Sequence, residues 1–220
     1  MTTVAAPRRI SSALRRTAIA DAVIEILAGQ GSRRLTHRAV DQHLGLAEGS
    51  TSGYYRTRAA LISAAAGRLV ELERDSLEGF MARLLSSAET LSAPELIDAA
   101  VTDWTTGETA TRQLARLELQ LELLRNPDLA ETLAEQRSSF IGMTQIFAKT
   151  LEAHIDQAAD PALLASAVAA LVDGLILDRL LYPATALAPE RLTTAVAQLA
   201  EGFHNQAISR WRPMHRHRLS

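Results

Sequence analysis

The chain has 220 residues, of which 47% are hydrophobic and 22% charged, the composition of a globular protein large enough for one or two domains. It contains no cysteine, which excludes disulfide bonds, thiol nucleophiles and cysteine-ligated zinc; four Phe, three Tyr and two Trp favour helices packed through small and aliphatic side chains, so we expect an all-α protein. The net charge is -2, but residues 1–58 carry nine Arg against two Asp and two Glu, a local charge of +5 that leaves -7 on the remainder.

The chain is expected to begin with an arm, residues 1–11, which shows no apolar period and either follows DNA phosphates or is simply disordered. A first helix is predicted over about residues 12–30, where apolar residues recur on one face and Gly31 ends the pattern. No signal peptide is visible, because Asp21 and Glu25 interrupt the first apolar run. The sequence therefore predicts a cytoplasmic protein.

A helix, a tight turn and a short second helix are predicted between Thr36 and Tyr54. Thr36 is placed to N-cap the first of these helices, and Gly45 can adopt the positive φ that ends it. The second helix, about residues 47–54, carries short polar side chains that suit a groove better than a core. A helix-turn-helix lays its second helix in the DNA major groove, and the basic charge of this part of the chain agrees with that interpretation; the alternative is a solvated basic face.

The motif supplies the candidate DNA contacts. The residues predicted to read bases are Ser50, Ser52 and Tyr54, with Glu48 accepting from a cytosine amino group. The residues predicted to contact phosphates are Thr36, Arg38 and Arg58, and His37 and Gly53 complete the predicted DNA-binding set. Thr51 and Tyr55 are expected to pack in the core of the DNA-binding domain, residues 1–58, which we call the head; we call the rest of the protein the body.

An ordered set of residues carries a family resemblance: Arg16, Ile19, Ala22, Gly31, Thr36, Val40, Gly45, Gly49, Ser50, Tyr54, Tyr55, Thr57, Arg58 and Leu61. With these matches, residues 10–61 resemble the DNA-binding domain of the TetR family of one-component bacterial transcriptional regulators. The family usually has Leu where this chain has Thr51 and Tyr where it has Ser52, so the contacts of the second helix are expected to differ. Beyond Leu61 the resemblance is architectural only.

A long helix is predicted to follow, with Thr57 as its N-cap and an apolar face that includes Leu61, Leu69 and Phe80. Since this helix joins the head to the rest of the protein, it would act as a lever, and the resemblance implies the same use. After a loop around residues 86–93, further helices are predicted over residues 94–107, with Gly107 as the end, and over 109–125, 127–158, 161–182 and 189–208.

The segment 161–182 is apolar nearly all round, so a membrane span must be weighed. Asp173 and the Asp178–Arg179 pair would each cost about 2.5 to 3.5 kcal/mol per charge in hydrocarbon, which favours a buried helix and no membrane association. The resemblance implies that this helix and the last one build a homodimer interface. The predicted interface residues are Ala167, Leu171, Gly174, Leu175, Val196, Leu199 and Phe203.

The helical body is expected to bind a small, largely apolar effector, because large apolar side chains occur there among a few polar ones. The alternative is that these residues form an ordinary core. The predicted lining residues are Trp104, Gln113, Leu117, Gln120, Leu121, Arg137, Phe140, Met143 and Phe147.

No catalytic motif is found: the sequence has no glycine-rich phosphate loop, no HExxH and no GxSxG. A helical enzyme using Asp173, Asp178 or His154 is a remote alternative, and a DNA-binding dimer without an effector is a nearer one. No cofactor, metal site or catalytic residue is predicted; the spacing of His215 and His217 in the tail would allow weak metal binding, but a designed site is not expected there.

The sequence thus predicts an arm and a three-helix, helix-turn-helix DNA-binding domain over residues 1–58, a helical ligand-binding and dimerisation domain over 59–209, and a basic, disordered tail over 210–220. The expected function is that of a homodimeric transcriptional regulator, most often a repressor in the family that the chain resembles. Its expected partners are double-stranded DNA with a palindromic operator, a second copy of itself and a small-molecule effector.

Overall fold

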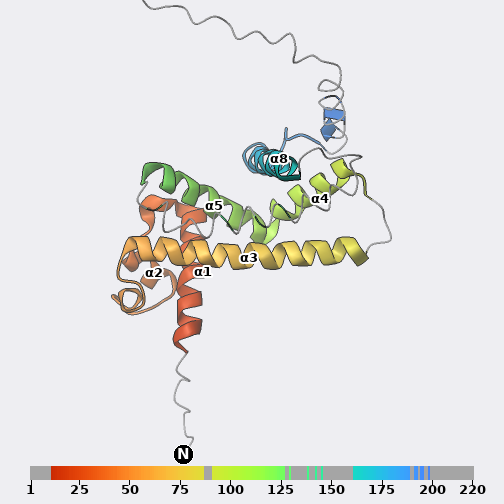
Figure 1. Cartoon of the computed structure of the whole chain (residues 1–220). Coiled ribbons are helices and arrows are strands. Elements are labelled where there is room, and N and C mark those ends of the chain that lie inside the picture. Colours follow the sequence, from red (N-terminus) through yellow and green to blue (C-terminus); the bar gives the residue numbers. More distant parts are fainter. Residues whose placement is uncertain are drawn as a thin grey trace, which may run out of the picture.

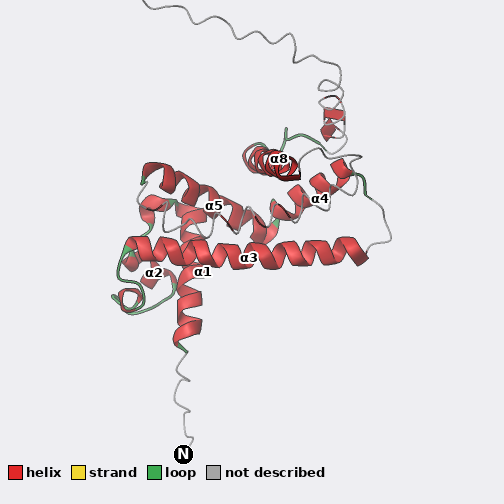
Figure 2. Cartoon of the chain, viewed as in Figure 1, coloured by secondary structure: helices red, strands yellow, loops and turns green. Residues whose placement is uncertain are grey.

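The computed structural model describes residues 11–86, 91–126 and 161–188, together with single positions at 129, 138, 142, 145, 191, 192, 194, 195 and 198. Every regular element in these residues is helical (Figure 2), which confirms the all-α prediction. The α-helices are α1 (Ser12–Gln30), α2 (His37–His43), α3 (Arg58–Ser86), α4 (Ala93–Trp104), α5 (Gly107–Arg125) and α8 (Pro161–Leu181). Two short 3₁₀ turns, η1 (Ser32–Arg34) and η2 (Thr51–Gly53), lie on either side of α2.

Local capping signals set the ends of the first helices. Ser11 Oγ accepts a hydrogen bond from Leu14 N at 3.2 Å at the start of α1, and Gly31, with φ 76°, ends that helix as predicted. Thr57 Oγ1 accepts from Ala60 N at 3.1 Å, so Thr57 also caps α3 as predicted. These bonds satisfy backbone N–H groups that would otherwise lack partners in the first turn of each helix.

The connection between α4 and α5 differs from the prediction. Helix α4 ends at Trp104, not at Gly107, and Gly107, with φ 56°, begins α5. The hydroxyls of Thr105 and Thr106 donate to the carbonyl oxygens of Val101 and Thr102, at 2.7 and 3.0 Å, so threonines satisfy the last carbonyl groups of α4 before the glycine is reached.

Helix α3 belongs to two hydrophobic clusters, one towards each of its ends. In Figure 1 it runs the length of the described molecule, with α1 crossing it near one end and α4 and α5 lying along it. The first cluster packs Leu61 and Leu69 of α3 against α1, α2 and Ala115 and Leu119 of α5. The second packs Phe80 against α4 and α8. Residues of the predicted head and body therefore share the first cluster.

The described residues include no helix that is both long and apolar enough to cross a membrane. The helices predicted over 127–158 and 189–208 lie largely outside the described residues; the single positions described within them are helical. Residues 1–10 of the predicted arm and the predicted tail, 210–220, also lie outside the described residues. The boundary predicted between residues 58 and 59 stays a prediction.

Replacing Leu69, which is fully buried in the first cluster, tests the importance of α3 for stability. Leu69→Ala should lower the free energy of unfolding by about 2–5 kcal/mol, because it removes apolar contacts and leaves a cavity. The matched variant Leu14→Ala, at a side chain that is 64% exposed, should change it by less than about 0.5 kcal/mol. Urea unfolding followed by circular dichroism measures both. Similar losses in the two variants would contradict this account of the core.

Candidate nucleic-acid interface and buried polar cluster

The segment predicted as the second helix of the helix-turn-helix is not an α-helix. It consists of a turn over residues 48–50 and the 3₁₀ turn η2. Backbone N–H groups here bond three residues back, as in Ser50 N to Ala47 O at 3.1 Å and Tyr54 N to Thr51 O at 3.0 Å. Gly49 has φ 88°, which a right-handed helix excludes. The α-helix predicted over residues 47–54 is therefore wrong in type and length.

Asp41 explains this conformation. Its carboxylate, buried at the end of α2, accepts hydrogen bonds from Gly49 N at 2.8 Å, Thr51 N at 2.8 Å and Thr51 Oγ1 at 2.6 Å. An α-helix beginning at Ala47 would direct the N–H of Thr51 to the carbonyl of Ala47, so the carboxylate competes with that helix. Burial acts to raise the pKa of Asp41, but the bonds from Thr51 and Gly49 together outweigh it and hold the pKa below its usual value.

A local bond caps α2, and one further contact joins α2 to the segment after η2. Thr36 Oγ1 accepts from Ala39 N at 3.0 Å and caps α2 as predicted. The ring of His37, predicted to contact DNA, directs Nε2 to the carbonyl oxygen of Tyr55 at 2.7 Å. Gly45, with φ 62°, supplies the predicted turn after α2. The head is therefore held by backbone-directed bonds from α2.

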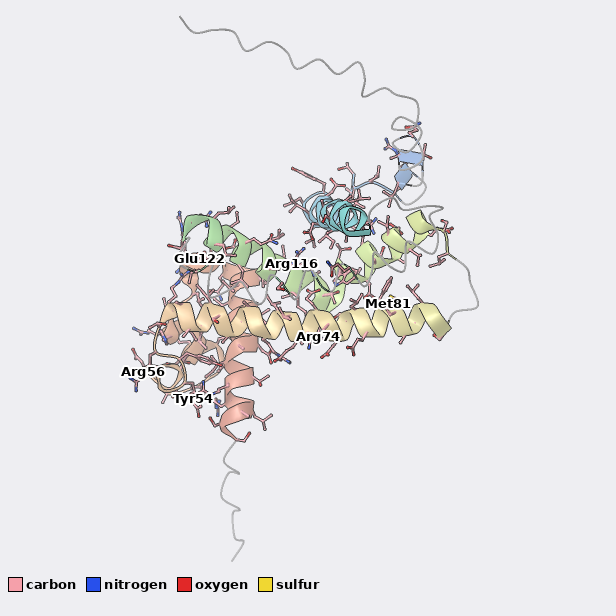
Figure 3. The ribbon with its side chains drawn as sticks, in the orientation of Figure 1. Tyr54, Arg56, Arg74, Met81, Arg116 and Glu122 are labelled. Atoms are coloured by element: carbon pink, nitrogen blue, oxygen red, sulfur yellow. The ribbon has the colours of Figure 1, made fainter. Side chains whose placement is uncertain are left out.

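Arg16 of α1 lies between the two tyrosines of the head. Its guanidinium carbon is 5.7 Å from the ring centroid of Tyr54 and 5.3 Å from that of Tyr55, and its Nη1 donates to Tyr54 O at 3.1 Å. Both rings are half-buried against the first cluster. Figure 3 shows Tyr54 and Arg56 on the other side of α3 from Arg116 of α5 in this view. We call residues 47–56 the tip of the head.

The predicted DNA-binding residues form one continuous part of the head, with different degrees of exposure. The exposed ones are Thr36, Arg38, Glu48, Ser52 and Gly53. The half-buried ones are His37, Ser50, Tyr54 and Arg58. Ser50 also donates its hydroxyl to Ala47 O at 2.6 Å. Their contacts with DNA stay predictions.

Arg58 forms hydrogen bonds with α5 and with η1. Its Nη1 lies 2.5 Å from Glu122 Oε1 of α5, and its Nη2 donates to Ser32 O at 2.9 Å. Glu118, one turn earlier on α5, accepts from Ser32 N at 3.0 Å. The Arg58 hydrogen bond is the main cause of a lowered pKa at Glu122. These two bonds use two of the five N–H donors of the guanidinium, and the predicted phosphate contact of Arg58 stays a prediction.

A second polar group lies between α3, α4 and α5. The Glu73 carboxylate, only 6% exposed, accepts from Trp104 Nε1 at 2.8 Å through one oxygen and from Gln113 Nε2 at 2.7 Å through the other. Arg116 Nε donates to Gln113 Oε1 at 2.8 Å, and its Nη2 donates to Asp173 Oδ1 of α8 at 2.8 Å. Burial raises the pKa of Glu73. We give the name buried polar cluster to the buried Glu73 and Gln113 together with the half-buried Trp104 and Arg116 and the exposed Asp173 at its edge.

The structure brings together only part of the predicted effector site. Trp104 and Gln113 meet at Glu73, Leu117 is half-buried, and Gln120 and Leu121 are exposed. The other predicted lining residues, Arg137, Phe140, Met143 and Phe147, lie outside the described residues. Glu73 was not among the predicted lining residues, although its position in the sequence offers a signal that could have identified it.

That signal is spacing. Glu73 lies four residues after Leu69 and four before Leu77, on the apolar stripe of α3, where a carboxylate is out of place. Asp41 and Glu122 offered no such local signal.

The predicted interface residues of α8 fall on two faces. Leu171 and Leu175 are half-buried and pack within the second cluster. Ala167 and Gly174 are exposed, and Leu177 continues their face with 38% of its surface exposed. Val196, Leu199 and Phe203 lie outside the described residues.

Three comparisons relate the chain to known proteins. The family model described as "Tetracyclin repressor-like, C-terminal domain" matches residues 92–202, which is half of the chain. That match is independent of the residues that carried the resemblance in the head. The comparison with curated proteins found no match.

Solved structures share the fold. A candidate transcriptional regulator from Saccharomonospora viridis, in complex with choline, has a TM-score of 0.63 and 16% identity, over 86% of this chain and 97% of its own. A candidate TetR-family regulator from Rhodococcus sp. has a TM-score of 0.62 and 20% identity, over 86% and 97%. The multidrug binding protein EbrR, complexed with ethidium, has a TM-score of 0.56 and 26% identity, over 84% and 98%.

Asp41→Asn tests whether the tip of the head depends on this carboxylate. An amide cannot accept all three bonds and turns an N–H group towards other donors, so the free energy of unfolding should fall by about 1–3 kcal/mol near neutral pH. Because the folded-state pKa is depressed, the contribution of Asp41 is complete above its ordinary value of 3.8 and is lost as the pH falls through the folded-state pKa.

Urea unfolding of both proteins at several pH values measures this difference. The exposed variant Gln42→Ala, next in the same helix, is the control and should behave like the wild type. A constant difference between Asp41→Asn and wild type down to the lowest pH would contradict the assignment.

Proposed function

The chain belongs to the TetR family, and on this premise we propose that it is a homodimeric transcriptional repressor that leaves a palindromic operator when a small molecule binds its body. The observation that carries the proposal is the head: it presents exposed polar residues at a tip that Asp41 fixes to α2, in residues 1–58, whose net charge is +5. The protein would act by binding, not by catalysis, and in the cytoplasm, where operator DNA is accessible.

Specificity for an operator is assigned to the tip of the head. Ser52 and Glu48 are exposed and short enough to reach base edges without ordering a long side chain. Arg38 and Arg56 are exposed beside them and suit phosphates. Thr51, in contrast, is buried against Asp41 and supports the tip from within.

Communication between body and head is assigned to two routes. The first is α3, whose apolar face is buried in both hydrophobic clusters, so a shift at the Phe80 end also changes the packing at the Leu61 end. The second is α5, where Glu118 and Glu122 hold Ser32 and Arg58 of the head. A ligand that binds the DNA-free arrangement better than the DNA-bound one must weaken DNA binding by linkage.

Dimerisation is assigned to the outward face of α8. Ala167, Ala170 and Gly174 leave room for close approach of a second helix, and Leu177 and Leu181 supply exposed apolar surface on the same side. A twofold dimer binds two half-sites about one helical turn, roughly 34 to 36 Å, apart, which is why the operator should be a palindrome.

The effector is proposed to be a small, largely apolar molecule bound near the buried polar cluster. Complexes of similar structures with choline and with ethidium support a body that binds small organic molecules. Trp104 and Phe80, whose ring centroids are 5.9 Å apart, supply aromatic surface at this place. The competing function is a DNA-binding dimer without an effector, which would release its operator only through protein contacts or dilution.

Selection from a pool of random DNA duplexes tests the DNA-binding function and should enrich a palindrome. With the enriched duplex, Arg38→Ala should weaken specific and non-specific binding by similar factors and reduce the salt slope by about one unit, because a phosphate contact releases counterions without reading a base. Ser52→Ala should change the preference among operator variants instead. Enrichment of no palindrome, or an unchanged salt slope for Arg38→Ala, would contradict these assignments.

Leu177→Glu tests the dimer, since a charge in an apolar contact is unfavourable by several kcal/mol when it lacks a partner. The dissociation constant of the dimer should rise about tenfold or more in this variant, and tenfold corresponds to about 1.4 kcal/mol. Thr111→Glu, which adds the same charge at an exposed position of α5, is the control. Sedimentation velocity measures both. Intact dimers of Leu177→Glu would place the interface on another surface.

A further inference from the structure

The position of Glu73 is unusual for a carboxylate. It lies on the apolar stripe of α3 with Leu69 and Leu77, and only 6% of its surface is exposed. An ionised carboxylate in such a place is unfavourable unless a cation or several hydrogen bonds compensate its charge. A leucine here would leave the indole N–H of Trp104 and the amide N–H of Gln113 without an acceptor, and a glutamine has one oxygen for these two donors.

The described residues compensate Glu73 only in part. Both of its oxygens accept from neutral donors, the indole N–H of Trp104 and the amide of Gln113. Two acceptors filled by N–H donors favour the ionised form, because a protonated oxygen accepts poorly. A carboxylate has about four acceptor positions, so capacity remains for a further donor.

The neighbouring arginines have carboxylate partners of their own. Arg112 bonds Ser76 Oγ at 3.0 Å and Glu108 Oε2 at 3.2 Å, and Arg116 bonds Asp173 at 2.8 Å. No ion pair joins Glu73 to an arginine within the part of the chain that the structure describes. Both arginines act on Glu73 through space only. The cluster contains two acids, Glu73 and Asp173. Asp173 has an ion pair with Arg116, whereas Glu73 has no ion pair within the described residues.

Aromatic rings stand beside this carboxylate. Trp104 contacts it through Nε1, and Phe80 lies against Trp104 with an interplanar angle of 39°. The faces of aromatic rings attract organic ammonium groups, and the attraction strengthens when water is excluded. From this geometry we propose that Glu73 and Trp104 recognise the positively charged group of an organic cation, so that the effector is an alkylammonium or a cationic aromatic compound.

This assignment rests on the proposed effector-binding function, and it predicts selection by charge at constant shape. The probes are choline and benzyltrimethylammonium, each compared with the neutral isostere that has carbon in place of the quaternary nitrogen. The full chain carries Trp211→Phe, so that Trp104 is the only remaining tryptophan and reports binding through its fluorescence. At least one cation should bind about tenfold or more tightly than its isostere, a difference of about 1.4 kcal/mol.

Glu73→Gln should bring the affinity ratio of cation to isostere to about one, because it removes the charge at nearly constant size; the amide also accepts only one of the two bonds from Trp104 and Gln113, which affects cation and isostere alike. Glu78→Gln, which removes a charge from an exposed position of the same helix, is the matched control and should leave the ratio unchanged. Circular dichroism and operator binding verify that both variants are folded. Equal affinities of cation and isostere in the wild type, a preference that survives Glu73→Gln, or no binding of either cation would overturn the assignment.

A second measurement needs no substitution at Glu73. Cation affinity should fall as the pH is lowered through the pKa of Glu73, which burial raises, while the affinity for the neutral isostere stays constant. Arg112 and Arg116 are the charged groups acting on Glu73 from α5, and Asp173 is the other acid of the cluster. Asp173→Asn should preserve the pH dependence. A pH-independent cation affinity would contradict a role for Glu73.

Binding of operator DNA and binding of cations at Glu73 are measured separately, so each proposal can fail without the other. Operator affinity is measured with and without each cation in the same proteins. A cation that binds through Glu73 but leaves operator affinity unchanged would support the site and reject its role as effector site. Failure to bind operator at all, with charge-selective binding intact, would reject the proposed function and leave the cation site standing.

Discussion

The burial of one helix, α3, at both of its ends is the constraint on which the rest of the structure depends. Its apolar residues from Leu61 to Leu69 complete the cluster that also contains α1, α2 and α5, and Phe80 belongs to the cluster formed with α4 and α8. Close-packed side chains transmit displacement because interiors have few voids to absorb it. The head and the body of this regulator are therefore mechanically connected by packing as well as by sequence.

Three acids are buried together with the apolar side chains: Asp41, Glu73 and Glu122. Asp41 holds the tip of the head, Glu122 holds Arg58, and Glu73 lies beside Trp104. The first two have lowered pKa values because hydrogen bonds favour their ionised forms, whereas the burial of Glu73 raises its pKa. At Asp41 and Glu122 the hydrogen bonds outweigh burial, whereas at Glu73 burial outweighs the hydrogen bonds and the nearby arginines.

The ion pair between Arg58 and Glu122 changes the interpretation of the start of α3. A basic residue next to a DNA-binding turn suggests a phosphate contact, but both terminal nitrogens of Arg58 bond to groups of α5 and η1. Arg38 and Arg56 are exposed, and they remain our proposed phosphate contacts. The contact with Glu122 joins the first residue of α3 to α5.

The sequence by itself determined the all-α class, the family resemblance, confirmed by an independent match over residues 92–202, and the ends of several helices. Thr36, Thr57, Gly31 and Gly45 act within a few residues of their own positions, so their effects are readable locally. Only the tertiary structure decided that residues 47–54 are not an α-helix, that Arg58 faces Glu122, and which side of α8 is exposed. Each of these depends on a partner elsewhere in the fold: Asp41 reaches across a turn to Gly49 and Thr51, and Glu122 lies 64 residues from Arg58. Local periodicity cannot report such pairs, because the free energy that selects them arises only when the packed elements bring the groups together.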